Sequence, residues 1–89
     1  MNELPLIPAP RSFRPSGLTV EPGSLTLTEA VVPALGFTPQ HNPNAAYELD
    51  FGPQGATLRA LSPAGIGYGR TSWQALVAAG SVPGGRIED

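Results

Sequence analysis

The run from residue 47 to residue 80 constrains the fold most, because two alternating segments lead directly into a helical one. Tyr-Glu-Leu-Asp-Phe at 47–51 places apolar side chains on one face of a strand and carboxylates on the other. Ala-Thr-Leu-Arg-Ala-Leu at 56–61 alternates in the same way, and Gly-Pro-Gln-Gly between the two segments is typical of a hairpin loop. The pattern predicts a β-hairpin over residues 47–61.

A helix is predicted over residues 62–80. Ser62 can cap free backbone N–H groups, and Pro63 is tolerated at the first helical position because no N–H donor is needed there. Gly80 and then Pro83 mark its end. The apolar stripe that would face a sheet consists of Ile66, Trp73, Leu76 and Val77.

Three glycines in the first half of this helix, Gly65, Gly67 and Gly69, need a reason. Each costs about 1 kcal/mol of helix stability relative to alanine. A phosphate-binding loop would need Gly-x-Gly-x-x-Gly directly after a strand, but here the third glycine comes one residue early and the helix has already begun. The glycines therefore indicate a helix backbone that lies close against a sheet.

The first half of the chain is rich in proline. Residues 1–16 are predicted to be an extended lead, because prolines at positions 5, 8 and 10 fix φ and favour extended geometry before them. Proline cannot donate to a β-ladder, so the segment is an edge strand or a linker and not a central strand. A ligand for an SH3-like groove is the alternative, disfavoured by the absence of a flanking basic residue in the usual arrangement.

Residues 18–20 and 25–27 alternate apolar and polar side chains, which predicts two short strands or a hairpin. Pro22 and Gly23 between them suit the central positions of a type II turn.

Residues 28–46 are predicted to be a long and mobile loop, because prolines interrupt the segment repeatedly. One helical turn at residues 33–35 is compatible with it. Regular secondary structure is expected again from the hairpin onward, and the sequence of residues 86–88 predicts a last short strand.

These elements define the expected fold class, which is α/β (α+β): a small mixed or antiparallel sheet of about four strands covered by one main helix. With 89 residues and no cysteine, we expect one domain over residues 1–89 and no disulfide. Eleven glycines and eleven prolines approach the level of low-complexity chains, but a hydrophobic fraction of 40% favours a folded domain.

The charge pattern restricts the partners. The net charge is −2, and five arginines are scattered along a chain without lysine, so we expect no nucleic-acid binding. No apolar run approaches the roughly 20 residues that cross a bilayer, so we expect no membrane partner. The first residues lack the pattern of a signal peptide, which leaves a cytoplasmic chain or a secreted one whose signal was removed.

Candidate chemistry is sparse. His41 is the single histidine and would need three or four converging donors to hold a metal, so we interpret it as a solvated loop residue. Glu48 and Asp50 lie about 6–7 Å apart on one strand face, a separation compatible with glycoside hydrolysis. Alternating acids are also what a solvated sheet face shows, and that interpretation is favoured. We therefore expect no catalytic, cofactor-binding, substrate-binding or metal-binding residue.

The aromatic side chains admit two interpretations. Tyr47, Phe51, Tyr68 and Trp73 could form a platform on which a sugar ring stacks. Trp73 falls on the same helical stripe as Leu76, so packing in the core or against a partner is favoured.

The motifs from residue 46 to residue 89 resemble the small domain that precedes the catalytic barrel in family 20 glycoside hydrolases. The specific part is Ser-Pro-Ala-Gly-Ile-Gly-Tyr-Gly at 62–69, similar to the family's Ser/Thr-Pro-Ala-Gly-x-x-Tyr-Gly. The order of the hairpin strands, the closing Arg-Ile-Glu-Asp and the opening Leu-Ile-Pro-Ala-Pro also agree. Thr71-Ser72-Trp73 stands where the family has Gln-Thr-Leu, and the segment 28–46 is shorter, which implies a reduced version of the domain.

This resemblance implies a structural accessory domain that packs against a catalytic barrel absent from the chain. In the family, catalysis is substrate-assisted through an Asp–Glu pair in the barrel, and no catalytic residue of the family maps onto this chain. We expect the chain alone to be no enzyme, and its partner to be the barrel or another copy of itself. A free-standing carbohydrate- or protein-binding module is the alternative. The expected interface residues are Ile7, Pro8, Tyr68, Trp73 and Ile87.

Overall fold

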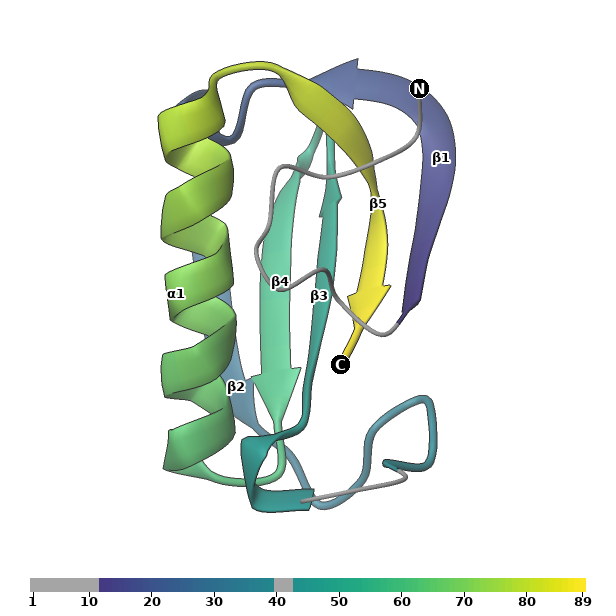
Figure 1. The fold of residues 1–89 in the computed structure, drawn as a ribbon, viewed down its shortest axis with the longest axis vertical. Coiled ribbons are helices and arrows are strands. Elements are labelled where there is room, and N and C mark those ends of the chain that lie inside the picture. Colours follow the sequence, from purple (N-terminus) through teal and green to yellow (C-terminus); the bar gives the residue numbers. More distant parts are fainter. Residues whose placement is uncertain (1–11, 40–42) are drawn as a thin grey trace.

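In the part of the chain that the structure describes, five strands form one mixed sheet and a single long helix covers one face of it (Figure 1). The computed structural model describes residues 12–39 and 43–89. In chain order the elements are β1 (Ser12–Val20), the 3-10 helix η1 (Pro22–Ser24), β2 (Leu27–Val31), the 3-10 helix η2 (Pro43–Ala45), β3 (Tyr47–Gly52), β4 (Gly55–Ala60), α1 (Pro63–Ala79) and β5 (Val82–Glu88).

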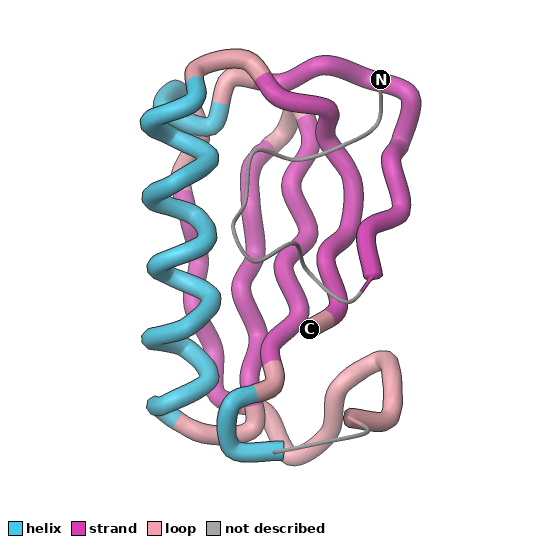
Figure 2. Tube along the Cα trace, in the orientation of Figure 1, coloured by secondary structure: helices cyan, strands magenta, loops and turns pink. Residues whose placement is uncertain are grey.

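The strands lie in the order β1-β5-β3-β4-β2. β2 runs parallel to β4, and the other neighbouring strands are antiparallel. β4 and β5 both pair antiparallel with β3, so they point the same way, and α1 carries the chain from one to the other past β3 (Figure 2). The predicted α+β class is confirmed, with five strands among the described residues where about four were expected.

The core lies between α1 and the sheet. Its fully buried side chains include Leu49 and Leu58 from the hairpin, Leu76 from α1 and Ile87 from β5. Trp73 packs edge-on against Phe51, with ring centroids 6.1 Å apart. The predicted alternation of the hairpin and the predicted helical stripe therefore meet in one hydrophobic core, except that Val77 is exposed.

Glycines bring α1 close to the sheet at two positions. A Cβ at Gly65 would collide with the carbonyl oxygen of Ala46, and one at Gly69 would collide with Leu58. Gly67 has nothing within 4 Å of such a Cβ. The interpretation of the glycines as contact positions is confirmed for Gly65 and Gly69 and is wrong for Gly67. All three lie inside the helix, which excludes a phosphate-binding loop here.

The hairpin suggested for residues 18–20 and 25–27 is not formed. β1 contains residues 18–20, whereas β2 begins only at Leu27, the last residue of the second segment. The two strands lie at opposite edges of the sheet. The chain between them forms η1, and Gly23 does not adopt the positive φ that a type II turn requires. The predicted extended lead, residues 1–16, is part of edge strand β1 from Ser12 onward, and residues 1–11 lie outside the described residues.

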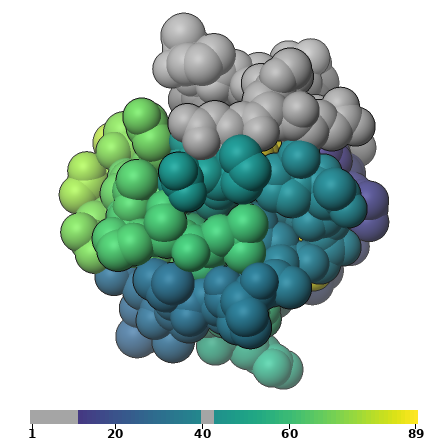
Figure 3. All heavy atoms as spheres, turned by 90° about the horizontal axis from the view of Figure 1, so that it is seen from below, coloured from purple at the N-terminus to yellow at the C-terminus, as the bar shows by residue number. Residues whose placement is uncertain are grey.

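The predicted loop over residues 28–46 begins later, because β2 extends to Val31. No helical turn forms at residues 33–35; the short helix is η2, next to β3. The loop after β2 and the start of α1 close one end of the molecule (Figure 3).

The last strand, predicted over residues 86–88, is longer and begins at Val82. It contains Pro83 and two glycines, which sequence patterns associate with turns. Gly84 permits this strand because a Cβ there would lie only 3.0 Å from Val20 and 3.1 Å from the Phe51 carbonyl oxygen. The close approach of neighbouring strands, which only the tertiary structure shows, explains the difference.

Candidate functional site

The outer face of α1 is nearly free of charge. Of the seventeen residues of α1, Arg70 is the only charged one. A helix that borders water normally carries charged side chains on its outer side, so this face is suited to contact with another protein surface. We define the outer face of α1 as Ala64, Gly67, Tyr68, Thr71, Gln74, Ala75, Val77, Ala78 and Ala79, all of which are exposed.

Tyr68 is the largest side chain on this face, and 58% of its surface is accessible. Its neighbours at helical spacing on this face, Ala64 and Thr71, are small, and Ala75 one turn beyond Thr71 is small too. A large aromatic side chain surrounded by small ones is a typical anchor for a protein interface.

Arg70 leans towards β2 instead of the outer face. Its guanidinium donates two hydrogen bonds to the carboxylate of Glu29, at 2.8 and 2.7 Å. The hydrogen bond from Arg70 holds the pKa of Glu29 below its ordinary value, and the same bond raises the pKa of Arg70. The one charge of α1 is thus neutralised at the edge of the sheet.

The opposite face of the sheet carries a network of alternating charges. We define the ionic network as Arg14, Glu48, Asp50, Arg59, Arg86 and Glu88, which come from four strands. It contains three positive and three negative side chains, so opposite charges can neutralise each other across the strands.

Arg86 is the centre of the ionic network. Its guanidinium lies 2.8 Å from Glu48, 3.0 Å from Glu88 and 3.5 Å from Asp50. Burial lowers the pKa of Arg86, but the charge of Asp50, the hydrogen bond to Glu88 and the charges of Glu48 and Glu88 together raise that pKa above its ordinary value. Arg86 therefore remains charged and holds three carboxylates together.

Glu48 is buried, with 2% of its surface accessible, although the sequence predicted a solvated carboxylate there. The loop after β2 covers it, and the backbone N–H of Gly36 donates a hydrogen bond to its Oε1 at 2.9 Å. A Cβ at Gly36 would collide with the guanidinium of Arg86. Alternation predicted the correct face for Glu48, but it could not show that a distant loop crosses that face.

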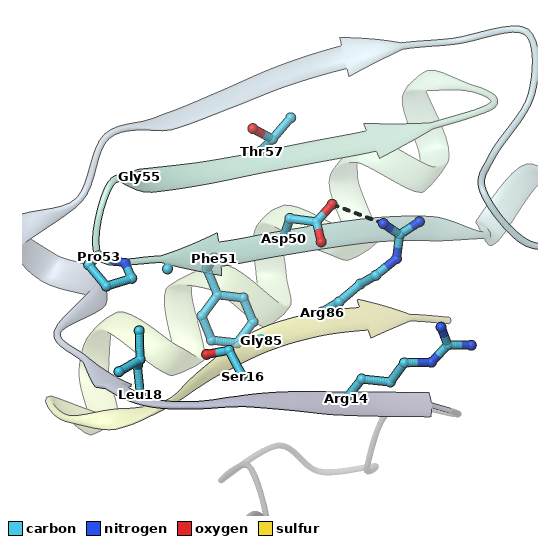
Figure 4. Close-up of a pocket in the computed structure, with 11 residues that line it drawn as sticks. Arg14, Ser16, Leu18, Asp50, Phe51, Pro53, Gly55, Thr57, Gly85 and Arg86 are labelled. Carbon is cyan, nitrogen blue, oxygen red and sulfur yellow. Dashed lines mark hydrogen bonds and ion pairs between the residues drawn. The ribbon is translucent and has the colours of Figure 1, made fainter.

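A hollow of about 390 Å³ lies beside the ionic network, on strands β1, β3, β4 and β5 (Figure 4). Its charged groups are engaged with one another, as Arg86 is with Asp50 and Arg14 is with Glu88. Ser16 donates its hydroxyl proton to the carbonyl oxygen of Gly84 at 3.1 Å. These contacts engage Arg14, Ser16 and Arg86 of the lining with other groups of the protein.

Across residues 12–39 and 43–89, no three histidine, cysteine or acidic side chains are grouped in a way that could hold a metal ion. In the same part of the chain, no helix is long and apolar enough to cross a membrane.

The residues predicted to contact a partner lie in different environments. Tyr68 is exposed on the outer face of α1, whereas Trp73 and Ile87 are buried in the core and have no surface left for a partner. Ile7 and Pro8 lie outside the described residues, as does His41. Only Tyr68 is therefore kept as an interface residue.

The alternative of a sugar-stacking platform is wrong for this arrangement of aromatic rings. Phe51 packs edge-on against Trp73, Tyr47 is buried in the same core, and of these four rings only Tyr68 is exposed. The ionic network was missed at the sequence level. Its signal was the two-residue spacing of Glu48 with Asp50 and of Arg86 with Glu88, which alternation places on one sheet face.

Fold and surfaces together define a small α+β domain with one uncharged helix face and one ion-paired sheet face. Residues 11–89 match the family described as "Glycosyl hydrolase family 20, domain 2", and the chain belongs to that family.

A solved structure described as the crystal structure of a β-N-acetylhexosaminidase is similar to this chain, with a TM-score of 0.69 and 28% sequence identity. The match covers 92% of this chain and 17% of the hexosaminidase chain, so the present chain spans about a sixth of that enzyme. Among the curated proteins, no match is found.

Proposed function

We propose that this chain is the accessory domain of a β-N-acetylhexosaminidase-like glycoside hydrolase, and that it packs against the catalytic barrel of its parent protein through the outer face of α1. The observation that carries the proposal is the match to a hexosaminidase that covers nearly all of this chain but only 17% of the enzyme. A domain of this size and fold is one part of a larger hydrolase, and the reaction belongs to the remainder.

The two faces of the sheet support this assignment of the interface. On the face without the helix, the charged groups are satisfied by one another and by the loop at Gly36. On the helix side, Tyr68 and its small neighbours are exposed without charged groups around them. Covering the latter face costs little desolvation of charge and removes apolar surface from water.

The first test concerns the gene and the isolated chain. The reading frame beyond the codon for Asp89 should continue into a barrel of about 250 residues. The isolated chain should not release the chromophore from a chromogenic N-acetylglucosaminide. A stop codon after Asp89, or turnover by the isolated chain, contradicts the proposal.

The second test concerns the interface in the full-length protein. Tyr68→Glu introduces a charge at the centre of the outer face of α1, so it should lower the melting temperature of the parent hydrolase and reduce its hexosaminidase activity. Leu18→Glu is the matched control, because Leu18 is comparably exposed, at 54%, but lies at the hollow beside the ionic network. Equal effects of the two substitutions would argue against docking through α1.

A further inference from the structure

The two edges of the sheet differ in how they are protected from pairing with another strand. β1 contains Pro15 and the positive-φ Gly17, and its register with β5 shifts between Pro15 and Thr19. Proline and irregular register are devices that prevent an edge strand from binding a further strand. β2 has neither, because its five residues pair in unbroken register with β4.

The hydrogen-bond pattern shows which backbone groups β2 presents at its outer edge. The carbonyl oxygen of Thr26 accepts from the N–H of Ala56 at 3.1 Å, and the N–H of Val32 donates to the carbonyl oxygen of Ala60 at 2.8 Å. Even-numbered residues therefore bond to β4, since bonding alternates along a strand. The N–H and C=O groups at positions 27, 29 and 31 point away from the sheet.

We propose that the outer edge of β2 binds the β2 strand of a second copy of this chain, antiparallel and about a twofold axis at Glu29. In this register Leu27 lies opposite the partner subunit's Val31, and each opposed pair exchanges two backbone hydrogen bonds. The two sheets become one continuous sheet with α1 of each copy on the same face. A twofold interface must be self-complementary, and this register places Leu27 and Val31 in mutual contact across the axis.

The charge of Glu29 does not prevent this pairing. Two carboxylates directly opposite each other on neighbouring strands would repel. Each Glu29, however, is held by two hydrogen bonds from its own Arg70, so neutral ion pairs meet at the axis. The one charge that could protect this edge is thereby cancelled within the domain.

The surroundings of β2 leave space for the partner. Val31 is 56% exposed although it is large and apolar. A hollow of about 330 Å³ lies between β2 and α1, lined by Glu29, Val31, Ile66, Gly67 and Arg70 among others. Apolar side chains from the second copy can enter this hollow, and burial of Val31 then contributes to the association.

Backbone amide exchange, measured by NMR over a concentration series of the 89-residue chain, tests the proposal directly. The amides of residues 27, 29 and 31 should exchange rapidly in dilute solution and become protected as the chain dimerises. The amides of residues 28 and 30 are bonded to β4 and serve as an internal control, protected at every concentration. A chain that stays monomeric, or a dimer in which the three outward amides still exchange rapidly, overturns the proposal.

Substitutions at Val31 distinguish what its backbone N–H contributes to dimer stability from what its side chain contributes. Val31→Pro removes an outward N–H without removing a bond to β4, so light scattering should show loss of the dimer. Val31→Ala keeps the N–H and should weaken the dimer without abolishing it. A dimer that persists in folded Val31→Pro contradicts the proposal.

A second pair of variants leaves the backbone of β2 intact and tests the role of charge. Arg70→Gln leaves two unpaired carboxylates at the axis and should raise the dissociation constant. Glu29→Gln combined with Arg70→Gln removes both charges and should restore dimerisation. An equal loss of dimer affinity in the single and double variants would contradict the proposed register. Tyr68→Glu should leave this dimer unchanged, whether or not α1 contacts a barrel.

Discussion

Single glycine positions determine how closely α1 lies against the sheet. Gly65→Ala places a Cβ against the carbonyl oxygen of Ala46, which cannot move without displacing the start of β3, so unfolding free energy should fall by about 2 kcal/mol. Gly67→Ala is the matched control and should raise it by about 1 kcal/mol, because that Cβ meets open space and alanine favours the helix. Urea denaturation measures both values, and an equal effect of the two substitutions would refute close packing at Gly65.

Arg86 is the residue on which the ionic network depends. Arg86→Met leaves the buried carboxylates of Glu48 and Glu88 without their shared cation and should cost about 3 kcal/mol of stability. Arg59→Met removes an outer member of the network, and its cost should stay near or below about 1 kcal/mol. Chemical denaturation of both variants at neutral pH provides the comparison. A larger loss for Arg59→Met would place the centre of the network elsewhere.

Tyr47 gives the domain a dependence on alkaline pH. Burial raises the pKa of its hydroxyl, although the hydrogen bond with Ser72 acts in the opposite direction. The folded state therefore binds the phenolic proton more tightly than the unfolded state. The contribution of protonated Tyr47 to the unfolding free energy is fully present below a pH of about 10. It is lost as the pH rises through the pKa of Tyr47 in the folded state.

Denaturation curves at pH 8 and pH 11 test this assignment. The wild-type chain should lose stability between the two values, and Tyr47→Phe should lose distinctly less because it has no proton to release. The same loss in both proteins would attribute the alkaline effect to other groups.

At the scale of the element, the start of α1 is held by one serine. Ser62 Oγ accepts a hydrogen bond from the N–H of Gly65 at 3.4 Å and donates one to the carbonyl oxygen of Asn44 at 2.7 Å. Ser62→Ala removes both and should lower the unfolding free energy by about 1 kcal/mol, whereas Ser62→Asp keeps a capping acceptor and should lower it less. Thermal unfolding followed by circular dichroism would show the difference in stability. Equal stability of the two variants would mean that the cap at Ser62 does not contribute to stability.

Sequence patterns predicted the elements whose structure is decided locally. The hairpin and α1 follow from alternation, a glycine-containing loop, a serine cap and helical spacing, all contained in about thirty-five neighbouring residues. β1 and β5 were underestimated because Pro15, Gly17, Pro83 and Gly85 are typical of turns. A Cβ at Gly85 would collide with the carbonyl oxygen of Arg14, so glycine is needed there because of a strand residue 71 positions earlier in the sequence.

The surfaces were harder to predict than the elements. Tyr68 was predicted as an interface residue and is exposed, but Trp73 and Ile87, predicted with it, lie in the core. Spacing along a helix or strand identifies the residues that share a face, and it does not tell which face is covered by the rest of the domain. The burial of Glu48 beneath the loop at Gly36 has the same explanation.

At the scale of the whole molecule, three regions of the domain surface differ in their properties. The ionic network holds together the strands of one sheet face, the outer face of α1 is left uncharged, and β2 presents an unprotected edge. The family and the similar hexosaminidase structure place such a domain within larger hydrolases. In our account, α1 connects it to the catalytic barrel and β2 connects it to a second copy.

Hydroxyl-radical footprinting of Tyr68 tests docking through α1 most directly, with the isolated chain compared to the full-length parent protein. Tyr68 should be modified readily in the isolated chain and be strongly protected in the parent, while Leu18 should be modified at similar rates in both and buried Tyr47 should be protected in both. Modification of Tyr68 at the same rate in the two proteins would contradict docking through the outer face of α1.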